Sequence, residues 1–314
     1  MTVPALLTVP HTSPVAASYA RLAEVFPGLR IEEPAPDARL PRGAGWVGAD
    51  ELAAGGPALD AFLAWDNAQV LRDYGTQARP DVVAGFGLHR YAWPACLLVT
   101  VPWFLHRRVP RLPAHHVSFH RALGRLSVRV EEFACLPDDP AAALPGARVV
   151  PDEEALRAEV RASLAEHFEA VLDGFGPRMR RGRRALWGMA TDEIVEGLWY
   201  VADLLGEEDR AVAELDLLLP GATRTVTGGA GAPRTAGTAH APEKPLTPLK
   251  PLKPYAGSAG FRELPGAERA DGSPRATRDR ATCCFFYTLR PEDTCLTCPR
   301  TCDAERVRRL AEAA

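Results

Sequence analysis

Residues 281–310 read ATCCFFYTLRPEDTCLTCPRTCDAERVRRL, and this stretch decides how the end of the chain folds. It contains five of the seven cysteines of the 314-residue chain: Cys283, Cys284, Cys295, Cys298 and Cys302. Thiols spaced this closely are typical of a soft metal site or of disulfides. Adjacent cysteines reach one small ion less easily than the C-x2–4-C pairs of zinc sites. A two-iron cluster spreads four thiolates over a larger target, so the spacing favours an iron–sulfur cluster.

Two other interpretations of the cysteines stay open. A zinc knuckle could use Cys295, Cys298, Cys302 and one of the adjacent pair. A disulfide-stapled tail is less favoured, because disulfides belong to oxidising compartments. The first residues, MTVPALLTVPHTS, have no positive charge ahead of an apolar core and make a poor signal peptide. We therefore expect a cytoplasmic protein.

The spacing Cys-Cys, ten residues, then C-x-x-C near the C-terminus resembles the FhuF-like ferric-siderophore reductases, in which four such cysteines hold a 2Fe–2S cluster. The stretch quoted above carries the resemblance, including the aromatic run at 285–287 directly after the pair. Position by position, the resemblance implies four cluster ligands: Cys283, Cys284, Cys295 and Cys298. Cys302 is an addition to the pattern, either a spare thiol or an alternative ligand.

The resemblance also implies an activity. A protein of this family passes one electron from its cluster to siderophore-bound Fe(III) and releases Fe(II). The implied partners are a ferric siderophore, of the hydroxamate type, and an external electron donor such as a ferredoxin or flavin reductase. It implies no catalytic residue beyond the cluster and identifies no substrate-binding residue. The alternatives are an iron–sulfur redox or iron sensor, an electron carrier without substrate turnover, and a structural zinc module.

Composition limits the class of protein. Hydrophobic residues make up 46% and charged residues 25% of the chain, ordinary values for a soluble globular protein. The formal net charge of −3 argues against a nucleic-acid partner, which would normally require a basic excess. The longest apolar stretch, 92–105, is too short to span a bilayer and is interrupted by Pro94 and Pro102. It is typical of a buried core segment, with at most peripheral membrane contact.

The apolar periodicity predicts an α+β protein that is mainly α. Ile194, Leu198 and Leu205 belong to one of several apolar stripes at helical spacing. The predicted helices cover 13–25, a segment from about 57, a segment from about 81, and segments starting near 151, 194 and 207. Alternation in 116–135 predicts one β-hairpin against the helical core. The helices after 151 and around 194–205 are expected to pack as an antiparallel pair.

The composition also divides the chain. Residues 1–219 are expected to form an α-rich substrate-binding body, and 276–314 a cysteine-rich cluster module. Between them, residues 220–275 read as a connector, because its first 55 residues contain nine prolines and nine glycines. Prolines three apart, the period of a polyproline II segment, occur inside it at Pro245, Pro248, Pro251 and Pro254.

Other residues capable of chemistry are given ordinary roles. A basic run is interpreted as a solvated helix end: Arg178, Arg180, Arg181, Arg183 and Arg184. Surface roles are expected for His115, His116, His120 and His89. Gly85 and Gly87 lack the third glycine of a dinucleotide loop. Cys96 and Cys135 read as buried small hydrophobes. The aromatic run 285–287 serves either to shield the cluster or to anchor the module.

Overall fold

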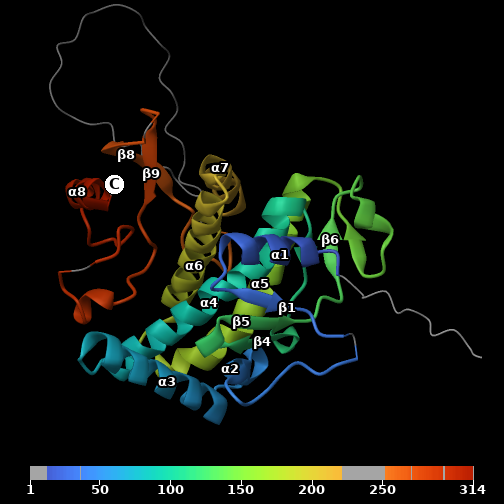
Figure 1. Cartoon of the computed structure of the whole chain (residues 1–314), viewed down its shortest axis with the longest axis horizontal. Coiled ribbons are helices and arrows are strands. Elements are labelled where there is room, and N and C mark those ends of the chain that lie inside the picture. The colour runs from blue at the N-terminus through green and yellow to red at the C-terminus, as the bar shows by residue number, and fades with distance from the viewer. Residues whose placement is uncertain (1–12, 36, 221–251, 270, 293, 314) are drawn as a thin grey trace, which may run out of the picture.

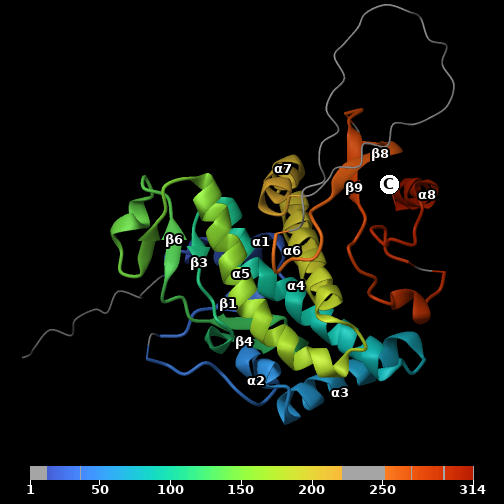
Figure 2. The ribbon, with the colours of Figure 1, turned by 180° about the vertical axis from the view of Figure 1, so that it is seen from behind.

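The computed structural model describes residues 13–35, 37–220, 252–269, 271–292 and 294–313. Of these residues, 54% are helical and 14% lie in strands, which confirms a mainly α protein of the α+β class. Figures 1 and 2 both show a helical body with a smaller C-terminal unit, coloured orange to red, along one side of it.

The predicted helices are present, although α6 begins at Arg183 rather than near 194, and α2 and α8 are added. The described helices are α1 (Ala16–Val25), α2 (Ala49–Ala54), α3 (Pro57–Tyr74), α4 (Pro80–His106), α5 (Glu153–Phe175), α6 (Arg183–Leu204), α7 (Glu208–Leu218) and α8 (Asp303–Ala313). Local chemistry explains their ends. For α5, the Asp152 carboxylate accepts a hydrogen bond from the Ala155 N–H at 2.8 Å, and Glu153 lies at the positive end of the helix dipole.

Helix α4 is the centre of the body, where it contacts α1, α3, α5 and α6. Among the described helices it is long and apolar enough to cross a membrane, but 83% of its apolar window is buried inside the protein. The prediction of a buried core segment at 92–105 is therefore confirmed. Because α6 packs mainly on α4, the expected pairing of α5 with α6 is only a minor contact.

The prolines of α4 do not interrupt it, contrary to the expectation from the sequence. Pro102 has no N–H, so it leaves the carbonyl of Leu98 without its helical donor. The hydroxyl of Tyr19, on α1, donates to that carbonyl at 2.9 Å in the buried core. A tertiary hydrogen bond thus replaces the missing helical one.

Two small sheets lie against the helices. One has the strand order β1 (Arg30–Glu32), β5 (Arg125–Val128), β4 (Val117–His120), β2 (Trp46–Gly48). The other has the order β3 (Val109–Pro110), β6 (Phe133–Cys135), β7 (Ala147–Val149). Strands β4 and β5 pair antiparallel, which confirms the predicted hairpin. It ends at Val128 rather than at 135, because residues 133–135 form β6, which pairs with β3 and β7 in the second sheet.

The range predicted as a connector contains part of a folded unit. Residues 221–251, with Pro245, Pro248 and Pro251, lie outside the described residues. Strand β8 (Phe261–Glu268) pairs antiparallel with β9 (Pro274–Arg278), so the folded C-terminal unit begins earlier than composition predicts. An irregularity in register spaces the buried residues Phe261, Leu264 and Ala267 three apart. The alternation that would have revealed a strand is therefore missing.

His167 on α5 is a buried histidine held in its neutral form. Its Nδ1–H donates to the Leu112 carbonyl at 2.8 Å, so Nε2 accepts from the Tyr91 hydroxyl, also at 2.8 Å. Burial lowers the pKa of His167 to about 4. The unfolded chain takes up this proton near pH 6.5. The contribution of neutral His167 to the free energy of unfolding is therefore fully present above pH 6.5 and is lost as the pH drops toward 4.

When the pH is lowered from 7 to 5, the free energy of unfolding should fall by about 2 kcal/mol because of His167, since only the unfolded state binds the extra proton. Denaturant unfolding at both pH values should show a smaller loss in His167→Gln than in the native protein. His115→Gln is the control, because His115 is exposed. Equal losses in the native protein and His167→Gln would contradict this origin of acid sensitivity.

Candidate metal centre

The structure brings four of the five clustered cysteines together from two loops. Cys283 and Cys284 follow β9, and Cys295 and Cys298 precede α8. The Cys295 thiol donates a hydrogen bond to the sulfur of Cys284. Cys283 is close enough to interact electrostatically with Cys284 and Cys298. Two sulfurs also accept backbone hydrogen bonds, from the N–H groups of residue 285 at 3.4 Å and of residue 300 at 3.5 Å.

The hydrogen bond within this group makes one cysteine acidic. Donation from Cys295 lowers the pKa of Cys284, with smaller help from Arg280 and His89. The same bond raises the pKa of Cys295, which keeps its proton. The thiolate is the form of cysteine that binds metals, so a shared proton in this pair favours one thiolate among the four thiols.

Cys302 does not join this group. It is exposed, and its carbonyl accepts hydrogen bonds from the N–H groups of Glu305 and Arg306 at the start of α8. Within the described residues its side chain makes no interaction. The geometry therefore separates Cys302 from the other four.

The four thiols are not arranged around a single ion. In the part of the chain that the structure describes, no group of three or more His, Cys, Asp or Glu side chains is placed to hold one metal ion. A structural zinc site needs its sulfurs about 2.3 Å from one centre. A two-iron cluster takes four thiolates spread over two iron ions, and it is the cysteine spacing that favours it over zinc.

A buried carboxylate of α6 holds the first cysteine loop. Asp192 is fully buried and accepts hydrogen bonds from the N–H groups of Ala281 at 2.8 Å and Thr282 at 2.9 Å. It also accepts one from the Thr282 hydroxyl at 3.0 Å and forms an ion pair with the fully buried Arg278 at 2.8 Å. The residues immediately before Cys283 are thus fastened to the body.

Residues 280–300 match the family described as FhuF 2Fe–2S C-terminal domain. The chain carries a 2Fe–2S domain of the FhuF type. No curated protein matches the chain. The cofactor of this domain is a 2Fe–2S cluster, and the four neighbouring thiols supply the donor set that such a cluster needs. We propose Cys283, Cys284, Cys295 and Cys298 as its ligands and Cys302 as a spare thiol.

A group of ion pairs lies beside the proposed cluster ligands. Nδ1 of His89 is 2.7 Å from the carboxylate of Glu193, which also pairs with Arg280. Burial lowers the pKa of His89, but the charge of Glu193 and a hydrogen bond to it act in the opposite direction, and the net result is a raised pKa. His89 and Arg280 line a cavity of about 260 Å³ together with Cys284 and Cys295. His89 therefore has a structural place beside the site, which the expectation of a surface role missed.

The aromatic run of the 2Fe–2S domain anchors it to the body. The ring of Phe286 contacts Tyr74 of α3 and Phe86 of α4, with ring centroids 5.5 and 6.3 Å apart. Of the two roles considered for this run, these contacts favour the anchor.

The sequence did contain a signal for the charged contacts of α6. Its apolar face carries carboxylates at 192, 193 and 196, which indicate that this helix packs against a positively charged partner.

Arg181 is the member of the basic run that reaches the 2Fe–2S domain. Its guanidinium donates to the Cys283 carbonyl at 2.5 Å and lies 3.9 Å from the ring centroid of Phe285. Burial lowers its pKa, while the neighbouring thiols Cys283 and Cys284 act in the opposite direction. Arg183 is exposed, as expected, but it begins α6 and pairs with the carboxylate of Asp173 instead of ending the preceding helix.

Replacing Arg181 with glutamine should lower the reduction potential of the cluster by tens of millivolts. A nearby positive charge favours the more negative, reduced state, and about 59 mV corresponds to a tenfold change for one electron. A redox titration followed by visible absorption measures the shift. The control is Arg180→Gln, since Arg180 is exposed. Identical potentials in both variants would rule out this role of Arg181.

The remaining predicted residues lie away from the thiols. Cys96 and Cys135 are buried, as expected. His115 is exposed and His120 half-buried, whereas His116 is buried and 3.7 Å from Glu131. These three histidines do not form a metal site with any described cysteine or carboxylate.

Proposed function

We propose that this protein reduces siderophore-bound Fe(III) by one electron and so releases Fe(II). The observation that carries the proposal is the group of four thiols within the stretch that matches the FhuF 2Fe–2S domain. Hydroxamate oxygens are hard donors that favour the ferric ion. Adding one electron lowers the charge of the iron and weakens its hold on these oxygens. One-electron reduction is thus a sufficient release step.

The chain contributes position and electrostatics to this reaction. When bound, the cluster supplies one electron at a time. Asp192 and Arg280 connect the cysteine loop to α6 through buried ion pairs. Arg181 places a positive charge beside Cys283. The electron comes from an external donor, for which we propose a ferredoxin or a flavin reductase.

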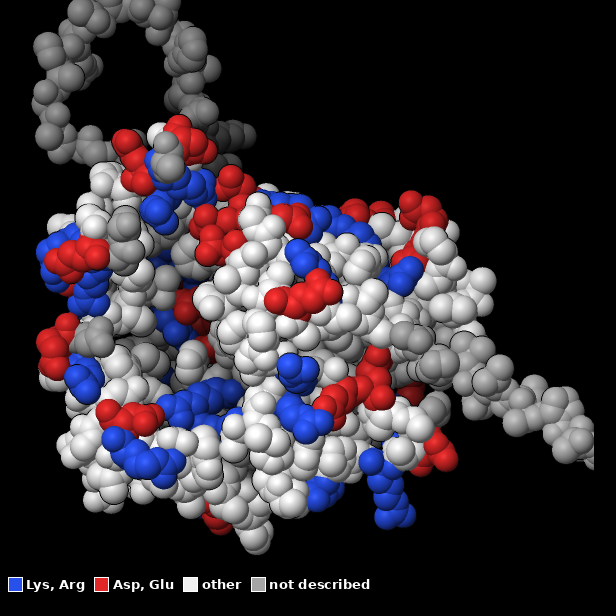
Figure 3. Space-filling view, viewed as in Figure 1, with Lys and Arg blue, Asp and Glu red and all other residues white. Residues whose placement is uncertain are grey.

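We also propose that the protein works in the cytoplasm and binds no nucleic acid. Figure 3 shows basic and acidic side chains interspersed over the face in view, without a broad patch of one sign. Such a surface does not favour a polyanionic partner, which is recognised mainly by clustered Lys and Arg.

The test mixes anaerobically reduced protein with a ferric trihydroxamate and follows the visible spectrum. The oxidised-cluster bands should return, and one Fe(II) should be trapped by a ferrous-specific chelator for each cluster oxidised. The gallium(III) complex of the same chelator is the control, because gallium(III) does not accept this electron. A cluster that stays reduced with the ferric complex would favour a sensor or electron carrier instead.

A further inference from the structure

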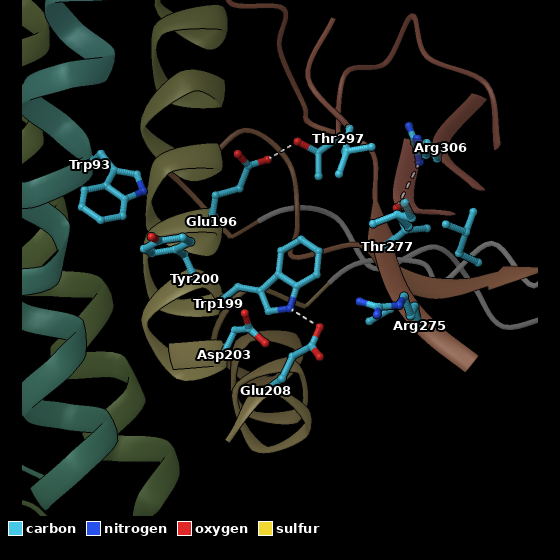
Figure 4. A pocket seen from close by; sticks show the side chains of 14 residues that line it. Trp93, Glu196, Trp199, Tyr200, Asp203, Glu208, Arg275, Thr277, Thr297 and Arg306 are labelled. Atoms are coloured by element: carbon cyan, nitrogen blue, oxygen red, sulfur yellow. Dashed lines mark hydrogen bonds between the residues drawn. The ribbon is translucent and has the colours of Figure 1, made fainter. Parts of the chain in front are cut away.

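A cavity lies between the helical body and the 2Fe–2S domain. Its volume is about 530 Å³, within the range of small-molecule sites. One wall comes from α4, α6 and α7, and the other from β8, β9, the second cysteine loop and α8, as Figure 4 shows for the labelled side chains. The cavity therefore lies where the two parts of the chain meet.

The second cysteine loop itself forms part of the cavity wall. Leu296 and Thr297 line the cavity and are the two residues between Cys295 and Cys298. Consecutive Cα atoms are about 3.8 Å apart, and each of these two residues is bonded to a proposed ligand, so a molecule that touches this wall lies close to the cluster site. The Thr297 hydroxyl donates to Glu196 of α6 at 2.6 Å, which holds the wall in place (Figure 4).

Aromatic and aliphatic residues make up half of the cavity lining, and most of the lining surface is apolar. Trp93, Trp199 and Tyr200 lie on the body side, and Leu296 on the opposite side. Tyr200 is 46% and Leu296 39% exposed, although both are large hydrophobic residues. Exposed apolar side chains gathered at one concave surface are typical of a ligand site. The lining suits a molecule with an apolar outer surface.

The charges of the cavity limit the charge of its ligand. Glu196 pairs with Arg278 and Arg280, and Glu208 accepts a hydrogen bond from the Trp199 indole at 2.9 Å and pairs with Arg269. Two exposed groups have no ion pair among the described residues. These are Asp203 on the α6 wall and Arg275 on the β9 wall. One free charge of each sign fits a neutral or singly charged molecule, not a trianion.

We propose that this cavity binds the ferric siderophore, with a preference for neutral or cationic trihydroxamate complexes. The proposal rests on the proposed function and adds a binding site to it. Three hydroxamate anions neutralise Fe(III), and the chelator surrounds the ion with methylene and amide groups. The aromatic side chains contact the methylene groups, and Asp203 accepts a hydrogen bond from an ammonium or amide group. An anionic triscatecholate would bring three excess negative charges to a cavity in which, among the described residues, Arg275 is the one unpaired cation and Asp203 an unpaired carboxylate.

The test measures binding without electron transfer. The probe is the gallium(III) complex of desferrioxamine B, titrated calorimetrically into the full chain. Tyr200→Ala should weaken binding about tenfold, since a large apolar contact is lost. Leu217→Ala, on the exposed face of α7 outside the cavity, should bind like the native protein.

The preference for charge is tested with two complexes, one cationic and one neutral. Asp203→Asn should weaken the cationic complex several-fold but leave the neutral, N-acetylated complex unchanged. Asp173→Asn is the control and should change the binding of neither complex, because Asp173 is an exposed residue of α5 that does not line the cavity. Equal weakening of both complexes by Asp203→Asn would overturn the charge selection.

The outcomes also separate this site from the proposed function. Native binding in Tyr200→Ala, or no binding to the native protein, would overturn the site even if the ferric complex is reduced. Binding that depends on Tyr200, together with a cluster that the ferric complex does not oxidise, would support the site and overturn the reductase.

Discussion

Replacing Cys295 with serine should abolish the visible absorption of the 2Fe–2S cluster, whereas replacing Cys302 with serine should leave it unchanged. Cys295 shares a hydrogen bond with Cys284 inside the group of four thiols. Cys302 is exposed at the start of α8 and makes no side-chain interaction within the described residues. An alkoxide is a poorer ligand for the cluster iron than a thiolate, so only the first change removes a needed donor.

The measurement combines the visible spectrum with iron and acid-labile sulfide per chain. Far-ultraviolet circular dichroism of both variants shows whether the helical body remains folded. Because the serine variants differ only in position, they are matched controls for each other. An intact cluster in Cys295→Ser, or a lost one in Cys302→Ser, would refute the ligand assignment.

Replacing Asp192 with alanine should destabilise the protein by about 3 kcal/mol and release the cluster during purification. The change leaves Arg278 buried without its closest partner, and breaking a buried ion pair is costly. It also removes the acceptor for the N–H groups of Ala281 and Thr282, so the loop before Cys283 loses its attachment.

Thermal unfolding and iron content measure the two effects of Asp192→Ala. Asp192→Asn keeps an oxygen acceptor for the loop and should lose less of both. Asp173→Ala is the matched control, because Asp173 pairs with Arg183 at the exposed surface and should change stability by less than about 0.5 kcal/mol. A cluster retained by Asp192→Ala at native stability would show that α6 does not hold the loop.

Local patterns of residues were enough to predict most of the helices and the 2Fe–2S cofactor. Apolar spacing and capping chemistry depend on residues within a few positions of each other, so α1, α3, α5, α6 and α7 could be read from the chain. The motif at 283–298 is equally local. Its spacing indicated an iron–sulfur cluster before any contact was known.

Contacts between distant residues determined the rest. The Tyr19 hydroxyl lets α4 continue through Pro102, and an irregular register hid β8. His89, Arg181 and Asp192 lie beside the cysteine loop although they are about 90 or more positions away from it. Asp192 in particular gained its role only when burial removed water and left its charge in need of a partner. The cavity beside Leu296 likewise exists only because the body and the 2Fe–2S domain fold against each other.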